Sequence, residues 1–361
     1  MKDIADNRKK TPAYLRLYFR VREDIVNGEY PFGSKLPSKR TLADAAGVST
    51  VTVEHAYALL CDEGYAEARE RSGYFVAFST EGGFASSAEA ENTPPGIRET
   101  TASKPEFPVS VLTKTMRRVM NDRGDEILAR SPNEGCLPLR EAIRSYLARN
   151  RGIKADVAQI IIGSGSEYLY GLIVETLGRD RVYAIEAPSY KKIEQVYTAC
   201  GVRCEKLPLG INGIESAALK KSRADVLHIS PYRSFPSGVT ADASKRHEYI
   251  RWAHNGRYIV EDDFESEFTL LKKPEETLFA LSDRENVIYI NTFSMTVSPS
   301  LRVGYMILPA SLLGAFREKA GFYSCTVPTF MQFVLAELIS NGDLERHINR
   351  VRRRKRSETD K

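Results

Sequence analysis

Short apolar runs that end in polar residues recur along the C-terminal two thirds of the chain and alternate with helical patterns. Such runs are typical of strands in a parallel sheet, which are buried on both faces. The predicted strands are Ile160–Gly163, Val182–Glu186, Val226–Ser230, Tyr258–Asp262 and Val287–Asn291. Phe107–Met120 and Leu139–Arg151 are predicted helices, and further helices are expected between the strands. This alternation predicts an α/β fold, with a mainly parallel sheet between two layers of helices.

Two of these strands run into polar segments. V-E-D-D-F-E-S-E-F begins at Val260, and Y-I-N-T-F-S-M-T-V-S-P-S-L-R-V-G-Y ends at Tyr305. In open α/β sheets, ligands bind outside the carboxyl ends of the strands. We therefore expect a small-molecule site where these two segments meet.

The N-terminal part of the chain follows a different pattern. Residues 12–28 place apolar positions at helical spacing between a proline and a glycine, which predicts a helix. Ser38 and Ser49 are residue types that cap helix N-termini, and the segments that they open end at Gly47 and Gly64. Two short helices joined at A-G-V-S predict a helix-turn-helix, whose second helix is the recognition helix.

Two predicted strands, Tyr65–Arg69 and Tyr74–Phe78, follow these helices and are connected by E-R-S-G, as in a wing. The motifs L-P-S-K-R-T-L-A, A-G-V-S-x-x-T-V, L-x-x-E-G-Y and S-G-Y-F-V together resemble the winged-helix domain of the GntR family. The resemblance implies a DNA-binding domain over residues 1–78. For the helix-turn-helix taken alone, the alternative is a structural helical hairpin.

DNA contacts are expected from the recognition helix, the residues before it and the wing. The candidates are Lys39, Arg40, Ser49, Thr50, Thr52, Arg69, Arg71, Ser72 and Gly73. Thr50 stands where the family often has Arg, so one bidentate contact to a guanine or a phosphate is missing. Residues 1–78 contain twelve basic and eleven acidic residues, so we expect two modules to bind DNA together.

Charge is concentrated at the C-terminal end. Residues 346–361 contain eight basic and two acidic residues, a net charge of +6, so the rest of the chain carries −1 of the total of +5. Nucleic-acid contacts therefore have to come from local arrangement. Residues 351–361 form a basic tail, and Arg350–Arg356 have two interpretations: the start of a helix that enters a further domain, or an arm on DNA phosphates.

Residues 79–106 are rich in Ser, Thr, Gly, Pro and Glu, and predict a flexible linker that spans roughly 30 Å. No apolar run approaches the ~20 residues that cross a bilayer, and no signal peptide is predicted at the N-terminus. The five cysteines are scattered, and no His completes a zinc spacing. We therefore expect buried free thiols, no metal site, no membrane contact and a cytoplasmic protein.

A series of motifs in the second part resembles the aminotransferase-like domain of the MocR subfamily of GntR regulators. It runs from S-P-N-E-G-C-x-P-L-R-E-A-I through G-S-G-S-E-Y-L, E-A-P-S-Y and S-P-Y-R-S-F-P-S-G-V-T to the two polar segments described above. These regulators join a winged helix to a domain of the fold-type-I pyridoxal-phosphate (PLP) enzymes. The resemblance implies such a domain over residues 107–350.

The resemblance also implies a cofactor pocket, formed by Ser164, Gly165, Ser166, Tyr190, Asp262, Phe264, Thr292, Ser294, Met295 and Arg302. Asp262 corresponds to the Asp that holds the pyridine nitrogen, and Tyr190 to an aromatic residue near the ring. Thr292, Ser294 and Arg302 fall where the family holds the phosphate. Taken without the resemblance, G-S-G-S fits a plain helix cap, Asp262 an acidic strand end and Tyr190 a core residue.

The same pocket departs from the family pattern. Met295 replaces the Lys that forms a Schiff base with PLP, and Phe264 stands where the family usually has Tyr. Tyr232-Arg233-Ser234 replaces a common Ser-His-Gln. The chain also ends before the family's C-terminal small domain, so we expect this domain to be incomplete and to lack the Arg that binds a substrate carboxylate. We predict no catalytic residues, and PLP bound non-covalently at most.

The sequence thus predicts a DNA-binding transcriptional regulator with a catalytically inactive aminotransferase-like domain. Expected partners are operator DNA, an effector that resembles PLP or an amino acid, and a second copy of the chain bound through Leu312–Tyr323 and Thr329–Leu338. Two alternatives stay open. One is a working PLP-dependent aminotransferase that carries a DNA-binding domain, and the other is a degenerate remnant that only dimerises.

Overall fold

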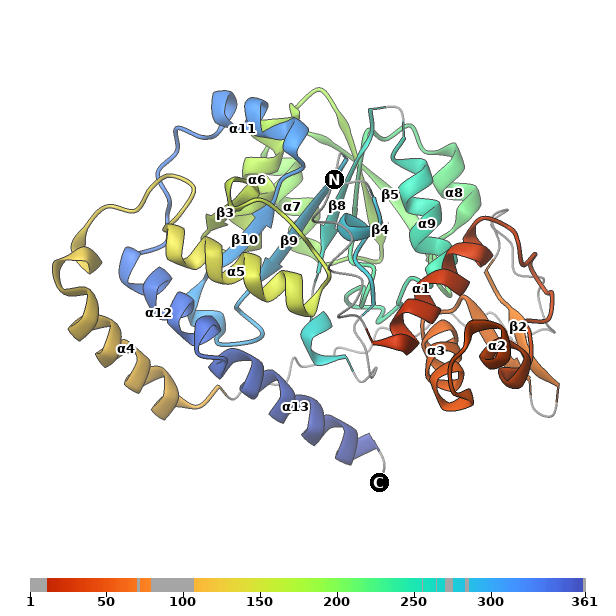
Figure 1. Ribbon diagram of the computed structural model, residues 1–361. Helices are drawn as coiled ribbons and strands as arrows, with labels where there is room; N and C mark the ends of the chain where they lie inside the picture. Colours follow the sequence, from red (N-terminus) through yellow and green to blue (C-terminus); the bar gives the residue numbers. More distant parts are fainter. Residues whose placement is uncertain are drawn as a thin grey trace. The chain divides into compact units, whose positions relative to one another are not determined.

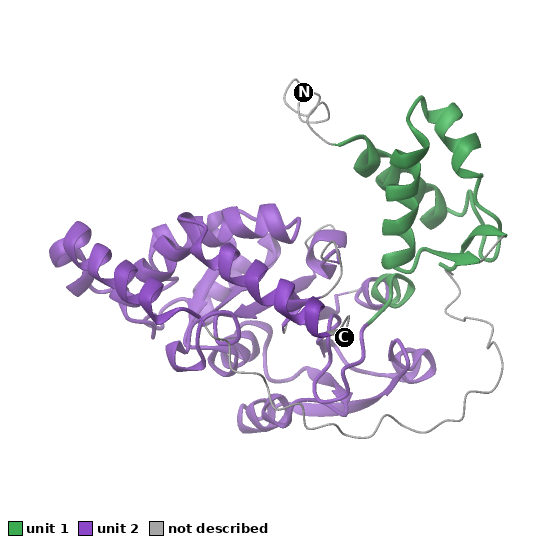
Figure 2. Cartoon of the chain, turned by 90° about the horizontal axis from the view of Figure 1, so that it is seen from below, with its two compact units in different colours: residues 1–92, 241–248 green, residues 93–240, 249–361 purple. Residues whose placement is uncertain are grey.

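The computed structural model describes residues 12–69, 72–78, 107–254, 256–263, 265–269, 275–282 and 286–359. The chain divides into two compact units, residues 1–92 with 241–248 and residues 93–240 with 249–361 (Figure 2). Three predictions lie outside the described residues: the linker 79–106, Arg71 at the tip of the wing and Phe264 in the pocket.

The first unit contains the predicted helix-turn-helix. Its helices are α1 (Ala13–Val26), α2 (Lys39–Ala46) and α3 (Thr50–Asp62). Ser38 Oγ accepts a hydrogen bond from the amide of Thr41 over 3.1 Å, and Ser49 Oγ accepts one from the amide of Thr52 over 3.2 Å. Gly47 ends α2 in the left-handed conformation, with φ of 63°. The predicted caps are confirmed, and α3 ends two residues earlier than expected.

The wing is a two-stranded antiparallel sheet of β1 (Ala66–Arg69) and β2 (Gly73–Val76). Both strands are one residue shorter than predicted, because the amides of Ala77 and Phe78 both donate to the carbonyl of Tyr65, which interrupts the regular ladder there. The segment before α2 adds a further contact, since the amide of Leu36 donates to the carbonyl of Tyr74 over 2.9 Å. The wing is therefore anchored to the start of the helix-turn-helix.

The second unit is built on an eight-stranded sheet with the order β3-β10-β9-β8-β7-β4-β5-β6. The strands are β3 (Ile160–Gly163), β4 (Val182–Ala187), β5 (Arg203–Gly210), β6 (Gly213–Ile214), β7 (Val226–Ile229), β8 (Tyr258–Asp262), β9 (Val287–Thr292) and β10 (Gly304–Ile307). The strands predicted from apolar runs are confirmed to within one residue at each end. The neighbours from β9 to β5 pair in parallel, whereas β10 pairs antiparallel with both β3 and β9.

The antiparallel strand β10 was not predicted. Its direction determines where the loop that carries Arg302 lies relative to the pocket. Because β10 runs against its neighbours, its first residue lies at the edge where β3 and β9 end. Gly304 is paired with both Gly163 and Thr292. The loop that enters β10, which carries Arg302, is thereby placed beside the carboxyl ends of the parallel strands.

The chain from residue 107 onward also contains helices (Figure 1). They are α4 (Val109–Arg123), α5 (Leu137–Asn150), α6 (Ser166–Leu177), α7 (Lys191–Ala199), α8 (Ser216–Lys221), α9 (Ala243–Trp252), α10 (Leu278–Leu281), α11 (Leu313–Lys319), α12 (Thr329–Ser340) and α13 (Asp343–Thr359). Short 3-10 helices occur at Gly124–Leu128, Val157–Gln159, Ser266–Phe268, Pro299–Leu301 and Ala310–Leu312. Apolar side chains of α6, α7 and α11 form one core with the sheet residues that face them, including Val260, Ile288 and Met306.

Helix α13 differs from our expectation of a separate basic tail from residue 351. The helix continues through this position to Thr359, and Val351 is buried together with Ile348 one turn earlier. The side chain of Arg352 donates to the main-chain carbonyl of Glu267 over 2.5 Å. Part of the basic segment therefore packs on its own domain.

The cysteine prediction needs one correction. All five cysteines are free, but only Cys136 is fully buried, and the other four are partly exposed. Cys200 directly follows α7, and Cys204 lies in β5, a strand with a polar sequence. Both residues are half-buried. Among the described residues, no helix combines the length and apolar character that a bilayer span requires.

Candidate ligand pocket and DNA-contact surface

A cavity of about 290 Å³ lies at the carboxyl ends of the parallel strands. Its lining includes seven of the predicted pocket residues: Ser166, Tyr190, Asp262, Thr292, Ser294, Met295 and Arg302. Ser164 and Gly165 are not part of the lining; they form the turn between β3 and α6. The structure thus brings most of the predicted residues together, from five separate segments of the chain.

Asp262 ends β8 and is held from the side of α6. The Tyr170 hydroxyl donates a hydrogen bond to Oδ2 of Asp262, and the Nε2 atom of His228 approaches the same oxygen to 3.5 Å. Tyr197 fixes the imidazole of His228 through its Nδ1 atom at 2.7 Å. Burial, together with the charge of Asp262, raises the pKa of Tyr170 well above its ordinary value, so this hydroxyl stays a donor. The carboxylate of Asp262 is therefore fixed in orientation at the cavity wall.

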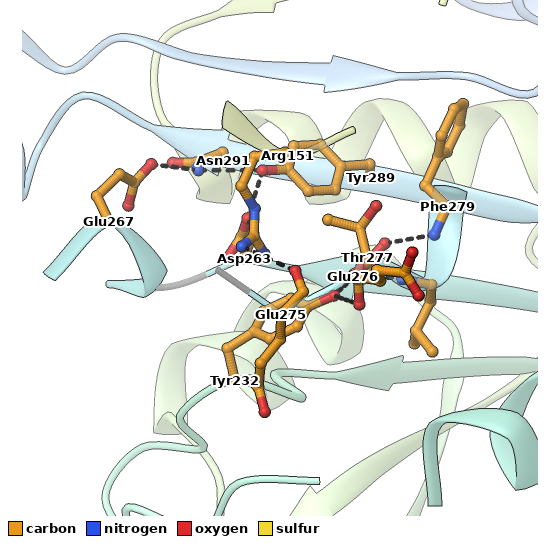
Figure 3. A network of polar contacts seen from close by, with 12 residues as sticks. Arg151, Tyr232, Asp263, Glu267, Glu275, Glu276, Thr277, Phe279, Tyr289 and Asn291 are labelled. Atoms are coloured by element: carbon orange, nitrogen blue, oxygen red, sulfur yellow. Dashed lines mark hydrogen bonds and ion pairs between the residues drawn. The ribbon is translucent and has the colours of Figure 1, made fainter. Parts of the chain in front are cut away.

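The next residue, Asp263, anchors a buried polar network that includes Arg151 and Tyr289 (Figure 3). Its Oδ2 atom lies 2.9 Å from Nη2 of Arg151 and accepts a 2.5 Å hydrogen bond from Tyr289. The guanidinium of Arg151 also stacks 4.5 Å from the ring of Tyr232. Burial lowers the pKa of Arg151, but Asp263, Tyr289, Tyr232 and Glu261 together raise it by more, so this pKa lies well above its ordinary value. This network forms a rigid support below the cavity.

The segment Tyr232-Arg233-Ser234, which departs from the family pattern, contacts three carboxylates. The hydroxyl of Tyr232 donates to Glu261, Arg233 forms a 2.6 Å ion pair with Glu265, and Ser234 Oγ donates to Glu186 over 2.6 Å. Glu186 and Glu265 both line the cavity. These carboxylates were absent from the predicted pocket, although the position of Glu186 near the carboxyl end of β4 was a usable signal.

Three buried glutamates in this region, Glu186, Glu261 and Glu267, have pKa values raised to about 7, chiefly by burial. Burial raises the pKa of Glu186 to about 7, against the lowering effect of the Ser234 hydroxyl. Burial also raises the pKa of Glu261 to about 7, although the carboxylate accepts hydrogen bonds from Tyr232 and from the amides of Leu278 and Phe279. Perturbed carboxyl groups next to a cavity are typical of functional sites.

Backbone strain is concentrated at the cavity. Among the described residues, Arg302 and Glu265 are the non-glycine residues with positive φ, 49° and 58° respectively. Both line the cavity. Side chains in this conformation are strained, and such residues gather at ligand sites, where the surrounding structure holds them in place.

The Arg302 guanidinium reaches the first turn of α6. Its Nη2 atom lies 3.3 Å from Oε2 of Glu167, whose other oxygen is 2.7 Å from Nζ of Lys192. Gly165 has a φ of 91°, and a Cβ atom added to it would lie 3.2 Å from the same nitrogen of Arg302. The glycine therefore makes room for the guanidinium, and Glu167 neutralises it.

The lining fits PLP only in part. The fixed carboxylate of Asp262 suits a protonated ring nitrogen, and Tyr190 stands beside Phe235 at the cavity with its ring 37 % exposed. However, no lysine occurs among the described lining residues, and the thioether of Met295 cannot condense with an aldehyde. The guanidinium of Arg302 already has an anionic partner. A covalently held PLP does not fit this donor set.

On the winged helix, some of the predicted DNA-contact residues are exposed, and others form contacts within the domain. Arg40 is exposed in the first turn of α2, and Ser49 and Thr50 are exposed at the start of α3. Thr52 is half-buried, and its hydroxyl lies 2.9 Å from that of Ser49, so both side chains serve the helix cap. Val51 is 57 % exposed in the same turn. It was not among the predicted contacts, although an apolar side chain here suits the methyl group of thymine.

The other predicted contacts are held by neighbours. Lys39 pairs with Glu54 of the recognition helix at 3.2 Å. Arg69 pairs with Glu67 at 2.6 Å, and its guanidinium stacks 4.3 Å from the ring of Phe75. In the turn of the wing, Ser72 is exposed, and Gly73 begins β2 with a φ of 110°.

Comparison with known protein families agrees with the division of the chain into two units. Residues 13–76 match the bacterial regulatory proteins of the gntR family, and residues 100–360 match the class I and II aminotransferases. The chain is 32 % identical over 356 residues to the uncharacterized HTH-type transcriptional regulator YdeL of Bacillus subtilis, covering 95 % of this chain and 76 % of that protein. It is 25 % identical to the probable rhizopine catabolism regulatory protein MocR of Rhizobium meliloti, covering 97 % and 76 %.

Among solved structures, the Pyrococcus horikoshii kynurenine aminotransferase is similar, with a TM-score of 0.65 and 26 % identity over 73 % of this chain and 68 % of that chain. The second unit, whose sheet order and pocket edge were described above, has this aminotransferase fold. The chain therefore belongs to the MocR subfamily of GntR transcriptional regulators, in which a winged helix is joined to an aminotransferase-like domain of fold type I.

Proposed function

We propose that this regulator uses its aminotransferase-like domain as a non-catalytic sensor of a small molecule, and that it acts on DNA as a homodimer. The observation that carries the proposal is the cavity beside Asp262, whose described lining contains Met295 and no lysine. A pocket of this kind can bind and orient a ligand. It lacks the amine that a transaminase uses to hold its cofactor and move protons.

The sensor role is supported by how firmly the cavity wall is built. Asp262 is fixed by Tyr170, and Asp263 by Arg151 and Tyr289. A rigid wall binds a ligand without first having to be ordered, which favours affinity. PLP or an amino-acid-like molecule, held without a covalent bond, is the ligand class that we infer for this cavity.

The dimer is supported by exposed apolar side chains on the second unit. Phe322 and Tyr323 stack on each other with ring centroids 4.5 Å apart, yet remain 63 % and 46 % exposed. Leu137 at the start of α5 is 47 % exposed. Apolar surface of this kind is typical of contacts between protein chains. A dimer would present two winged helices, which compensates for the balanced charge of a single module.

On DNA, we infer that α3 enters the major groove and the wing lies against the backbone. Arg40 then contacts phosphates, while Thr50 and Val51 reach base edges. Because the chromosome of a bacterium lies in its cytoplasm, this is also where we infer that the protein acts.

The test of the sensor role is chemical. The purified chain is incubated with PLP, treated with borohydride and digested, and the peptides are analysed by mass spectrometry. The proposal predicts no pyridoxyl group on any pocket residue, because borohydride traps only a carbon–nitrogen double bond to an amine. A pyridoxyl group fixed within the pocket, together with transfer of an amino group to a keto acid, would contradict the proposal and favour a working aminotransferase.

A further inference from the structure

We propose that Glu167 determines which class of ligand the pocket accepts, because its carboxylate takes the place of a ligand's anionic group beside Arg302. This inference rests on the proposed sensor function, since it concerns the same cavity. It identifies the residue that discriminates between phosphorylated and unphosphorylated ligands.

The geometry supports this role directly. Glu167 lies in the first turn of α6 and lines the cavity, with its side chain 30 % exposed. One of its oxygens is 2.7 Å from Nζ of Lys192, and the other is 3.3 Å from Nη2 of Arg302. Two cations from separate segments thus converge on one carboxylate. An arrangement of this kind is an anion site, and here the anion is supplied by the chain itself.

The neighbouring groups show where an external anion would have to bind. Thr292 and Ser294 place hydroxyl donors in the same lining as Arg302. Arg302 is kept near α6 by its strained left-handed backbone and by the open space at Gly165. A phosphate monoester that approached these donors would meet the carboxylate of Glu167. It would have to displace this carboxylate from Arg302 or bind next to a like charge, and both reduce affinity.

The lining is otherwise acidic. Six carboxylates line the cavity, namely Glu167, Glu186, Asp262, Asp263, Glu265 and Glu267, and Arg302 is the basic residue among the described lining. Asp263 and Glu265 have arginine partners of their own, Arg151 and Arg233. Glu167 is therefore the carboxylate whose removal would release the cation of the cavity.

The experiment compares two probes that differ by one phosphate group. Pyridoxine 5′-phosphate and pyridoxine have no aldehyde, so neither can react with a lysine. Their dissociation constants are measured by titration calorimetry on the full chain, for the wild type and for Glu167→Gln. Glu175→Gln is the matched control, because Glu175 lies on the same helix and pairs with Arg179 away from the cavity.

Glu167→Gln is expected to bind pyridoxine 5′-phosphate about tenfold more tightly than the wild type. The affinity for pyridoxine should stay within about twofold, and Glu175→Gln should resemble the wild type for both probes. In the double variant Glu167→Gln with Arg302→Gln, the gain should disappear, since the released cation is then absent. Equal melting temperatures without ligand would establish that the variants are folded.

Three results would overturn the inference. The first is an affinity for pyridoxine 5′-phosphate that is unchanged or lower in Glu167→Gln. The second is an equal increase in the affinity for both probes in this variant. The third is that neither the wild type nor Glu167→Gln binds either probe at millimolar concentration. None of these results bears on DNA binding, which is measured separately. The first two results contradict the role of Glu167 and leave ligand binding by the pocket in place, whereas the third also contradicts the proposed sensor function.

Discussion

The hydroxyl of Ser234 donates a 2.6 Å hydrogen bond to Oε2 of Glu186, a buried carboxyl group at the cavity wall. This bond favours the charged form of Glu186, but burial disfavours it more strongly and raises the pKa from its ordinary 4.5 to about 7. The pocket thus contains an acid that loses its proton near neutral pH.

The stability of the protein should depend on this group between about pH 4.5 and pH 7. In that window the unfolded chain has released the proton of Glu186 and the folded chain retains it, so stability falls as the pH rises. Glu186→Gln removes this contribution. We expect the variant to gain stability relative to the wild type on going from pH 4 to pH 8, on the order of 3 kcal/mol.

The measurement is thermal or urea unfolding over a pH series, with Glu141→Gln, an exposed site on α5, as the control. Only the slope against pH is diagnostic, because a constant offset merely reports the effect of the amide on packing. Parallel curves for the wild type and Glu186→Gln would show that Glu186 does not titrate in this range.

The ion pair of Arg151 with Asp263 should be strongly coupled to the stability of the second unit. Its two side chains are 5 % and 0 % exposed, so removal of the arginine leaves a buried charge without its partner. Arg151→Met should lower the free energy of unfolding by about 3–5 kcal/mol. Combining it with Asp263→Asn should recover part of this loss, since the uncompensated charge is then gone.

A surface pair provides the comparison for this experiment. Arg149 lies two residues before Arg151 and pairs with Glu345 at 3.1 Å, with side chains 51 % and 29 % exposed. Arg149→Met should lower the free energy of unfolding by less than about 1 kcal/mol. If both arginine variants lose the same stability in urea unfolding, the network around Asp263 is not a structural support of the cavity.

DNA affinity and DNA discrimination should respond to different residues of the winged helix. Arg40→Ala should weaken binding to a specific site and to random DNA equally, and should reduce the dependence of log K on log salt by about one unit. Val51→Ala should instead reduce the preference for the specific site and leave the salt dependence unchanged. Fluorescence anisotropy over a salt series measures both effects. A loss of discrimination in Arg40→Ala, with no effect of Val51→Ala, would reverse these roles.

Much of the fold follows from local sequence signals, and the exceptions have physical reasons. The strands β3 and β8 were predicted to the residue, because strands buried on both faces form continuous apolar runs. The strand β5 was missed, since its sequence R-C-E-K-L-P-L-G alternates irregularly and most of its residues are partly or fully exposed. The strand β10 has only four residues and no distinct pattern of its own.

The pocket residues that follow predicted strands could be predicted from the sequence. Contacts between residues that lie far apart in the sequence could not. Asp262, Thr292 and Met295 follow apolar runs, so their gathering at one edge could be expected. Nothing in the local sequence indicates that Arg151, at the end of α5, pairs with Asp263. The contact between Glu167 and Arg302 depends on the antiparallel pairing of β10, which only the folded sheet reveals.

Recognition of particular DNA sequences through the winged helix is the function that we infer for this chain. It is tested most directly by repeated selection of bound molecules from a random-sequence DNA library, with the full-length chain as the bait, followed by sequencing. We expect one enriched motif with two related half-sites, and its enrichment should fall sharply for Val51→Ala. A library that shows no enriched motif after selection, although the wild-type chain is folded, would contradict sequence-specific DNA recognition and favour a protein that only dimerises.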